Sequence, residues 1–143
     1  MLASPLMAKI FNLFSIKDEP GKGFSLAEAN RLVPLLRKYT EEAIRETGKI
    51  SAQLDFHDKA SEQYKSLSAA YDNSVMKWAE TMHRIGGLAK GLWTVDFDSG
   101  EFYFCWTYPE RRIDHFHQYD ETFKARKKVP SATEGTDSAT SSG

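Results

Sequence analysis

Residues 92–126 read LWTVDFDSGEFYFCWTYPERRIDHFHQYDETFKAR, and this stretch has the pattern of strands rather than helices. Apolar and polar residues alternate around Val95 and again around Phe104, which is the two-residue period of a β-strand. The tripeptide Asp98-Ser99-Gly100 separates the two runs and has the composition of a hairpin turn. The stretch also holds more than half of the aromatic residues and the single cysteine of the chain.

The alternation predicts a three-stranded antiparallel meander over residues 91–119. We expect its strands to begin at Leu92, at Glu101 and at about Arg112, with the last one ending at Gln118. One face of the second strand is wholly aromatic and is expected to pack against helices as core: Phe102, Phe104, Trp106 and Tyr108.

The preceding part of the chain has helical spacing and predicts a long antiparallel helical hairpin over residues 25–86. Ser25 and Glu28 have the spacing of a capping box, which marks a helix start. Pro34 falls inside the first apolar stripe and predicts a kink there rather than a second start. The pair Gly86-Gly87 is expected to end the second helix, since glycine readily adopts the left-handed cap conformation.

These elements predict an α+β fold with one domain over residues 24–130, in which the helical hairpin packs on the meander. Residues 120–130 would form a closing segment after the last strand. We expect residues 1–23 to form an N-terminal arm, and the Ser/Thr-rich residues 131–143 to form a disordered tail.

The composition excludes several classes of protein. The chain has 143 residues and a formal net charge of -1, so no excess of charge would attract nucleic acid or an anionic membrane. No stretch approaches the roughly 18 continuous apolar residues of a membrane span, and no signal peptide is recognisable. A single cysteine forms no internal disulfide. We therefore expect a cytoplasmic protein that does not bind membranes.

Several pieces of the sequence, in their order and spacing, resemble an uncharacterised bacterial family, domain of unknown function 2203. The resemblance covers about residues 24–130 and implies a helical hairpin followed by a small sheet, with no assigned activity. The pieces that carry it are Phe24-Ser25-Leu26, Glu28-Ala29-Asn30, Leu32-Val33-Pro34, Leu36-Arg37, Gly91-Leu92, Val95-Asp96-Phe97, Tyr103, Cys105-Trp106, Glu110, Ile113, Phe116-His117, Asp120, Phe123 and Arg126.

A metal site is one hypothesis for the third strand. His115 and His117 would point to one face, about 7 Å apart along the strand. Asp120 is a candidate third ligand, and Glu110 or Cys105 could serve instead. Imidazole and carboxylate groups suit zinc or iron. In the alternative interpretation both histidines are half-exposed strand residues, and no cofactor is required.

A small-ligand site is a second hypothesis for the same sheet. Arg126 could clamp a small anion through a bidentate contact. The residues that would form this site are His117, Asp120, Glu110, Arg126 and Trp106. A structural interpretation makes the charged residues an ion-pair network that locks the sheet to the closing segment, with members Asp96, Glu110, Asp120, Arg111, Arg112 and Arg126.

Two further chemistries are less favoured. Cys105 could act as a nucleophile only beside a basic group such as His117, and a cysteine on a central strand is more often a buried small hydrophobe. The aromatic face could stack nucleobases, but the basic residues Lys124 to Lys128 lie beyond the sheet, so binding of nucleic acid is not expected.

The leading functional hypothesis is a non-enzymatic interaction module that forms a homodimer through its helical hairpin. The seam expected to face a partner has approximate coiled-coil spacing and consists of Ala29, Val33, Leu36, Tyr39, Ala43, Ile50 and Leu54. The alternative is a small-ligand or metal-binding site on the sheet around His117, with a catalytic role open.

Overall fold

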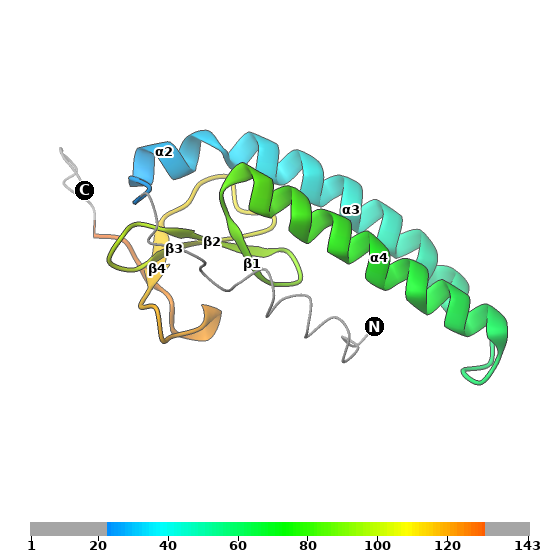
Figure 1. The fold of residues 1–143 in the computed structure, drawn as a ribbon. Coiled ribbons are helices and arrows are strands. Elements are labelled where there is room, and N and C mark those ends of the chain that lie inside the picture. The colour runs from blue at the N-terminus through cyan, green and yellow to red at the C-terminus, as the bar shows by residue number, and fades with distance from the viewer. Residues whose placement is uncertain (1–22, 131–143) are drawn as a thin grey trace.

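The computed structural model describes residues 23–130 and shows an α+β fold, as predicted (Figure 1). The predicted arm (apart from Gly23) and the predicted tail lie outside the described residues. Helices precede a single antiparallel sheet whose strands pair in sequence order. The elements are α2 (Leu26–Arg31), α3 (Val33–Leu54), α4 (Glu62–Ile85), β1 (Leu88–Gly91), β2 (Thr94–Asp98), β3 (Tyr103–Thr107), β4 (His115–His117), a 3₁₀ turn η1 (Phe123–Ala125) and β5 (Lys127–Lys128).

The helical part begins with the predicted capping box. The Glu28 backbone N–H donates to the Ser25 hydroxyl at 3.0 Å, and the Ser25 N–H donates to the Glu28 carboxylate at 2.9 Å. The predicted single kinked helix is wrong in one detail, because Leu32 divides it into α2 and α3. Pro34 lies in the first turn of α3, where its missing N–H removes no hydrogen bond within α3.

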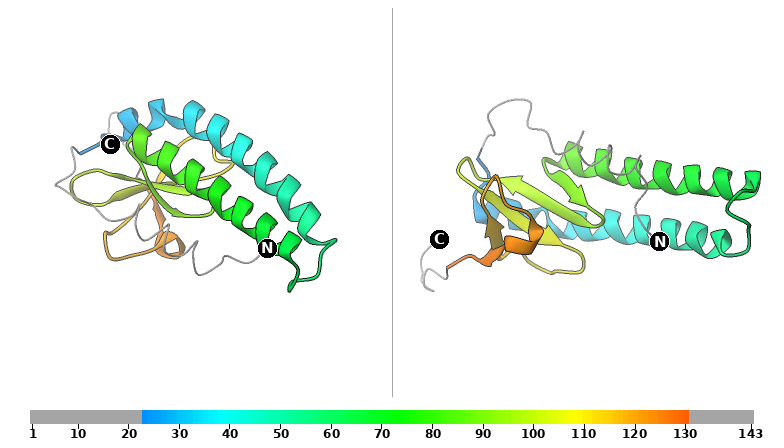
Figure 2. Two further views of the ribbon diagram at one scale, coloured as in Figure 1. Left: turned by 45° about the vertical axis from the view of Figure 1, so that its right-hand side comes forward. Right: turned by 90° about the horizontal axis from the view of Figure 1, so that it is seen from below.

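Helices α3 and α4 form the long hairpin, which extends well beyond the sheet (Figure 2). The predicted seam of α3 is almost entirely buried inside the chain, where it packs against α4 and the sheet. In one polar contact between the helices, the indole N–H of Trp78 donates to the Thr40 hydroxyl at 2.9 Å, with both side chains buried. The buried part of the seam therefore packs within the chain, and Tyr39 is its one half-buried member. Within residues 23–130 no helix is both long and apolar enough to span a bilayer.

Gly86 ends α4 in the left-handed conformation, with φ of 113°. An added Cβ would lie 2.7 Å from the ring of Phe24. We expect Gly86→Ala to lower the free energy of unfolding by about 1 to 3 kcal/mol, because alanine is strained at this φ. Gly48→Ala is the matched control. Its added Cβ lies inside α3 and meets nothing within 4 Å, so this variant should raise the free energy of unfolding by about 0.5 to 1 kcal/mol. Urea denaturation of both variants measures the difference, and an equal effect would contradict this account.

The predicted antiparallel meander is confirmed in its strand order, but the predicted number of three strands is wrong, because the sheet has five strands in the order β1-β2-β3-β4-β5. The strand predicted to begin at Leu92 corresponds to β2, which begins two residues later, at Thr94. The reason is that Trp93 has a φ of 67° and lies in the turn between β1 and β2. The third strand is reduced to His115–His117. Strand β5, with only two residues, is too short to show a period in the sequence.

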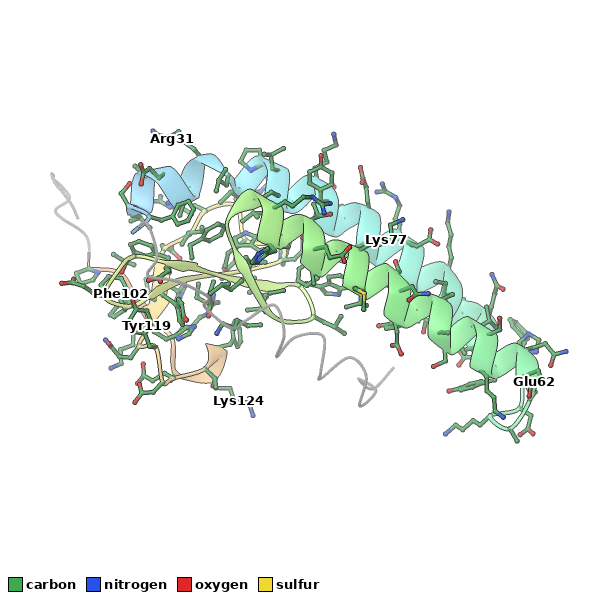
Figure 3. All side chains as sticks on the ribbon, in the orientation of Figure 1. Arg31, Glu62, Lys77, Phe102, Tyr119 and Lys124 are labelled. Atoms are coloured by element: carbon green, nitrogen blue, oxygen red, sulfur yellow. The ribbon has the colours of Figure 1, made fainter. Side chains whose placement is uncertain are left out.

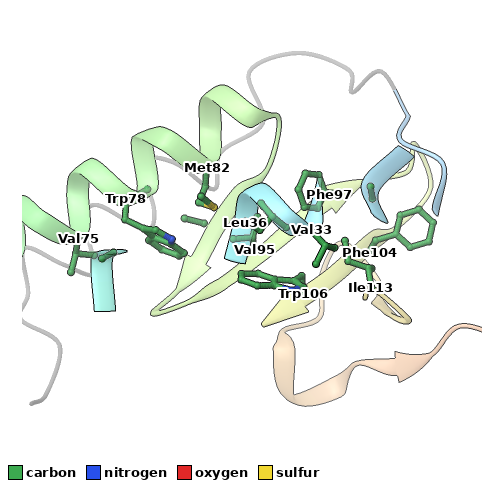
Figure 4. Close-up of a cluster of buried hydrophobic side chains, with 14 of the residues drawn as sticks. Val33, Leu36, Val75, Trp78, Met82, Val95, Phe97, Phe104, Trp106 and Ile113 are labelled. Carbon is green, nitrogen blue, oxygen red and sulfur yellow. The ribbon is translucent and has the colours of Figure 1, made fainter. Parts of the chain in front are cut away.

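The core lies between the hairpin and one face of the sheet (Figure 4). The aromatic face of β3 packs there, as predicted, with Phe104 and Trp106 both buried. The ring of Trp93 contacts Trp78 of α4 edge-to-face, with the ring centroids 5.0 Å apart. The aromatic face of β3 is therefore part of the core and is not available for stacking nucleobases.

Asn30 joins α2 to the segment before β4 by two hydrogen bonds. Its Nδ2 donates to the carbonyl of Ile113 at 3.0 Å, and its Oδ1 accepts from the Ile113 N–H at 2.7 Å. The Ile113 side chain is fully buried in the core. One amide thus satisfies both backbone groups of a buried residue distant in sequence.

Candidate metal centre

A polar cluster occupies the other face of the sheet, away from the hairpin. It contains Asp96 of β2, Cys105 of β3 and His117 of β4, all buried. Their side chains alternate with core residues such as Val95 and Phe104, so they point to the opposite face. Asp96 pairs directly with Cys105 across the strands, and Tyr103 with His117. One ligand atom from each of the three lies within 4.8 Å of the others.

The closing segment covers this face (Figures 1 and 2). The Tyr119 ring contacts the Tyr103 ring edge-to-face at 4.8 Å, and its hydroxyl donates to Asp98 at 2.6 Å. Arg126 follows η1 and reaches back to Glu110. Every residue of β2 is consequently buried, although only one face meets the helices.

His117 is fixed through both ring nitrogens. Its Nδ1 donates to the carbonyl of Gln118 at 2.9 Å, since a carbonyl only accepts. Its Nε2 lies 2.8 Å from Oδ2 of Asp96, and this short contact requires a proton between the two groups. Burial lowers the pKa of His117, but the hydrogen bond and charge of Asp96 raise that pKa by more, so the net shift is upward. The Asp96 carboxylate therefore favours the protonated form of His117.

The second carboxylate oxygen of Asp96 is also buried. Among residues 23–130, Oδ1 has no hydrogen-bond partner, although the Asp96 side chain is only 1% exposed. Asp98, two residues along the same strand, accepts bonds from Tyr119 and from the N–H of Gly100 through its Oδ1. A buried carboxylate oxygen without a donor is unfavourable, and it is available to a cation.

Cys105 carries its proton at neutral pH. Burial, followed by the Asp96 charge, raises the pKa of the Cys105 thiol to about 12, and Arg126 lowers it only in part. A protonated thiol is a poor nucleophile, which opposes a Cys105–His117 catalytic pair. A metal ion would reverse this state, because coordination deprotonates a thiol outright.

Arg126 and Glu110 form a bidentate pair beside the cluster. The two guanidinium nitrogens donate to the two carboxylate oxygens at 3.1 and 2.6 Å. Burial lowers the pKa of Arg126, but the Glu110 carboxylate, with a smaller contribution from Cys105, makes the net shift of this pKa upward. Glu110 also accepts from the N–H of Thr107, and its carbonyl accepts from the indole of Trp106 at 2.8 Å. Arg126 is thus already occupied and does not present a free anion clamp.

The structure brings together only part of the predicted site. The described residues with metal-ligand spacing do not include His115 or Asp120. His115 lies 2.7 Å from the Asp114 carboxylate, and Asp120 is exposed in the turn after β4. Trp106 points into the core instead of the polar face. Of the predicted ion-pair network, only Glu110–Arg126 forms within the described part of the chain, and Asp96 pairs with His117 instead.

Asp96 is the important residue that the metal prediction missed. It lies at a polar position of an alternating run, opposite Cys105 across the hairpin turn. The turn at residues 98–100 fixes this register. Counting back from the turn would have placed the carboxylate beside the thiol.

Stability of the metal-free protein should depend on pH through His117. Its folded pKa lies above the ordinary value of 6.5, so the stabilisation from the ion pair is fully present below that value. As the pH rises through the folded pKa, the imidazolium loses its proton and this stabilisation is lost. Urea denaturation across the neutral and alkaline range in the presence of a chelator measures the effect. His117→Gln should flatten the profile, and an unchanged profile in this variant would assign the pH dependence elsewhere.

Comparison with protein families gives one match. A family model described as "Uncharacterized conserved protein (DUF2203)" matches residues 22–129, which include every residue of the polar cluster. Comparisons with curated proteins and with solved structures gave no match. The matched segment spans well over half of the chain and agrees with the resemblance carried by the sequence motifs. The chain therefore belongs to the DUF2203 family.

Proposed function

We propose that this protein binds a divalent transition metal ion, with Zn²⁺ as the best fit, through Asp96, Cys105 and His117. One observation carries the proposal: three different ligand groups from three adjacent strands converge within 4.8 Å in a buried place. The buried Oδ1 of Asp96 supports it, because among residues 23–130 no donor lies in good hydrogen-bond geometry with this oxygen.

The chemistry of the donor set favours zinc. Thiolate, imidazole and carboxylate groups are its usual ligands, and three protein ligands leave one tetrahedral position for water or a small ligand. The thiolate selects against Mg²⁺ and Ca²⁺, which prefer oxygen ligands. The backbone carbonyl of Gln118 holds Nδ1 of His117, which leaves Nε2 directed at the cluster.

Binding would exchange protons for the ion. The thiol of Cys105 and Nε2 of His117 each lose a proton, so affinity should fall as the pH falls. The ion would then balance the charges of Asp96 and Cys105. The neighbouring Arg126–Glu110 pair is neutral as a unit and adds no net charge. The ion would link β2, β3 and β4, so its main consequence is stabilisation of the sheet.

A cytoplasmic location is part of this proposal, because a reducing compartment keeps Cys105 available as a ligand. The proposal requires no enzymatic activity.

Elemental analysis of untagged protein, combined with native mass spectrometry, tests the proposal. We expect about one zinc ion per chain, and a thiolate-to-metal charge-transfer band when Co²⁺ replaces zinc. Cys105→Ser should remove the band, and His117→Gln should remove the tightly bound ion. Asp98→Asn is the matched control, since this carboxylate lies on the same strand outside the cluster. Absence of stoichiometric metal after growth with zinc, or metal retained equally by Cys105→Ser, would overturn the proposal.

A further inference from the structure

A groove of about 480 Å³ runs along the helical hairpin between α3 and α4. Small side chains contribute to its lining, among them Ala43, Ala70 and Ser74, and Trp78 adds an aromatic surface. Three charged residues also line it: Glu42 and Glu46 on α3, and Lys77 on α4. Figure 3 labels Lys77 on the hairpin, distant from Phe102 and Tyr119, which lie next to strands of the sheet.

The groove lies beside the surface that packs on the sheet and shares only Ala43 and Trp78 with the buried core. Its α4 residues at positions 70, 74, 77 and 81 follow helical spacing. Val75, Ala79 and Met82 form a different stripe, which lies in the core. A partner in the groove would therefore meet mainly residues outside the core, together with the outward edges of Ala43 and Trp78.

The three charged groups in the groove are unpaired. Within the described part of the chain, Glu42, Glu46 and Lys77 make no ion pair within 4.0 Å, whereas Arg37 and Glu41 pair with each other one turn earlier on α3. All three side chains are exposed. The acidic groups lie on the α3 wall and the basic group lies on the α4 wall. The α3 wall of one copy is therefore complementary in charge to the α4 wall of a second copy.

We infer that a second copy of this chain docks in this groove, hairpin against hairpin, to form a symmetric dimer. A two-fold axis parallel to the helices places α3 of one copy against α4 of the other, and each interface contact then occurs twice. The small residues of the lining allow the helices to approach closely, as in a four-helix bundle.

The register of the hairpin aligns the charges in this arrangement. The hydrogen bond between Trp78 and Thr40 shows that these two residues lie at one level of the antiparallel pair. Glu42 and Lys77 lie within two residues of that level, at nearly equal heights, because each residue rises about 1.5 Å. Rotation about the axis preserves height. Glu42 of each copy therefore faces Lys77 of the other, with Glu46 one turn further along.

Charge reversal tests the dimer directly. Sedimentation equilibrium should show concentration-dependent dimerisation of the unaltered chain both with added zinc and, separately, with a chelator. Lys77→Glu places like charges at both symmetric contacts, as does the double variant Glu42→Lys/Glu46→Lys. Each should weaken self-association at least about tenfold. Lys65→Glu is the control, since Lys65 is an exposed lysine on α4 outside the groove.

Mixing the two reversed variants gives the decisive result. In a heterodimer each acidic wall again faces a basic one at both contacts, so the mixture should associate more tightly than either variant does alone. Circular dichroism confirms that each variant is folded. A monomer at all concentrations, equal weakening by Lys65→Glu, or failure of the mixed variants to associate would overturn the inference.

Discussion

Trp106→Ala should lower the free energy of unfolding by about 3 to 5 kcal/mol, a large part of the stability of a domain of this size. Trp106 is fully buried at the centre of the core between the hairpin and the sheet. Truncation removes its apolar contacts and leaves a cavity that the surrounding side chains fill only in part. It also removes the indole N–H that donates to the carbonyl of Glu110.

The control for this prediction is Trp106→Phe, which keeps most of the apolar volume and loses the donor. Its cost should be well below that of alanine. Urea denaturation of both variants gives the comparison. A loss of less than about 1 kcal/mol in Trp106→Ala would mean that the sheet does not pack on the hairpin as described.

His117→Ala should destabilise the metal-free protein by about 3 to 5 kcal/mol, because it leaves the Asp96 carboxylate buried without its cation. The charge cannot move to solvent, since the Asp96 side chain is 1% exposed. Unfolding in urea with a chelator present isolates this effect from any loss of metal.

The double variant Asp96→Asn/His117→Gln is the matched comparison. It removes both charges and keeps polar groups of similar size, so it should be clearly more stable than His117→Ala. The two single variants, Asp96→Asn and His117→Gln, complete the cycle with the double variant and isolate the coupling between the residues. If the losses of unfolding free energy in the two single variants add up to the loss in the double variant, Asp96 and His117 are not coupled. The ion pair then contributes little to stability.

The helical part of the fold could be predicted because its signals are local. The capping box at Ser25 and the glycine cap at Gly86 depend on residues within one turn of each other. The aromatic alternation in β3 was equally clear, and its packing on the hairpin is confirmed. Strands β1 and β5 were not predicted because they are short. For β1 there is a second reason: the backbone reverses at Trp93, and tryptophan rarely has a positive φ.

The candidate site was predictable only where a single strand determined it. His117 was identified from its own strand, but its partner Asp96 comes from β2, which is not adjacent to β4 in the sheet. Asp120 was expected to turn toward His117. Instead the chain turns outward at this point, where Glu121 accepts a hydrogen bond from the Gln118 N–H and Asp120 is exposed. Such a turn depends on a hydrogen bond between a side chain and the backbone, and the two-residue period of a strand does not predict this bond.

The Asn30–Ile113 contact has a consequence for the order of folding. Each strand pairs with the strand before it, and the hairpin forms from adjacent helices, so most of the fold needs only short loops to close. Asn30 instead bonds to a residue 83 positions away. During synthesis the helical hairpin leaves the ribosome first, and Asn30 cannot find its partner until Ile113 has followed. The nascent chain must therefore carry an open apolar surface on the hairpin until the sheet has emerged to cover it.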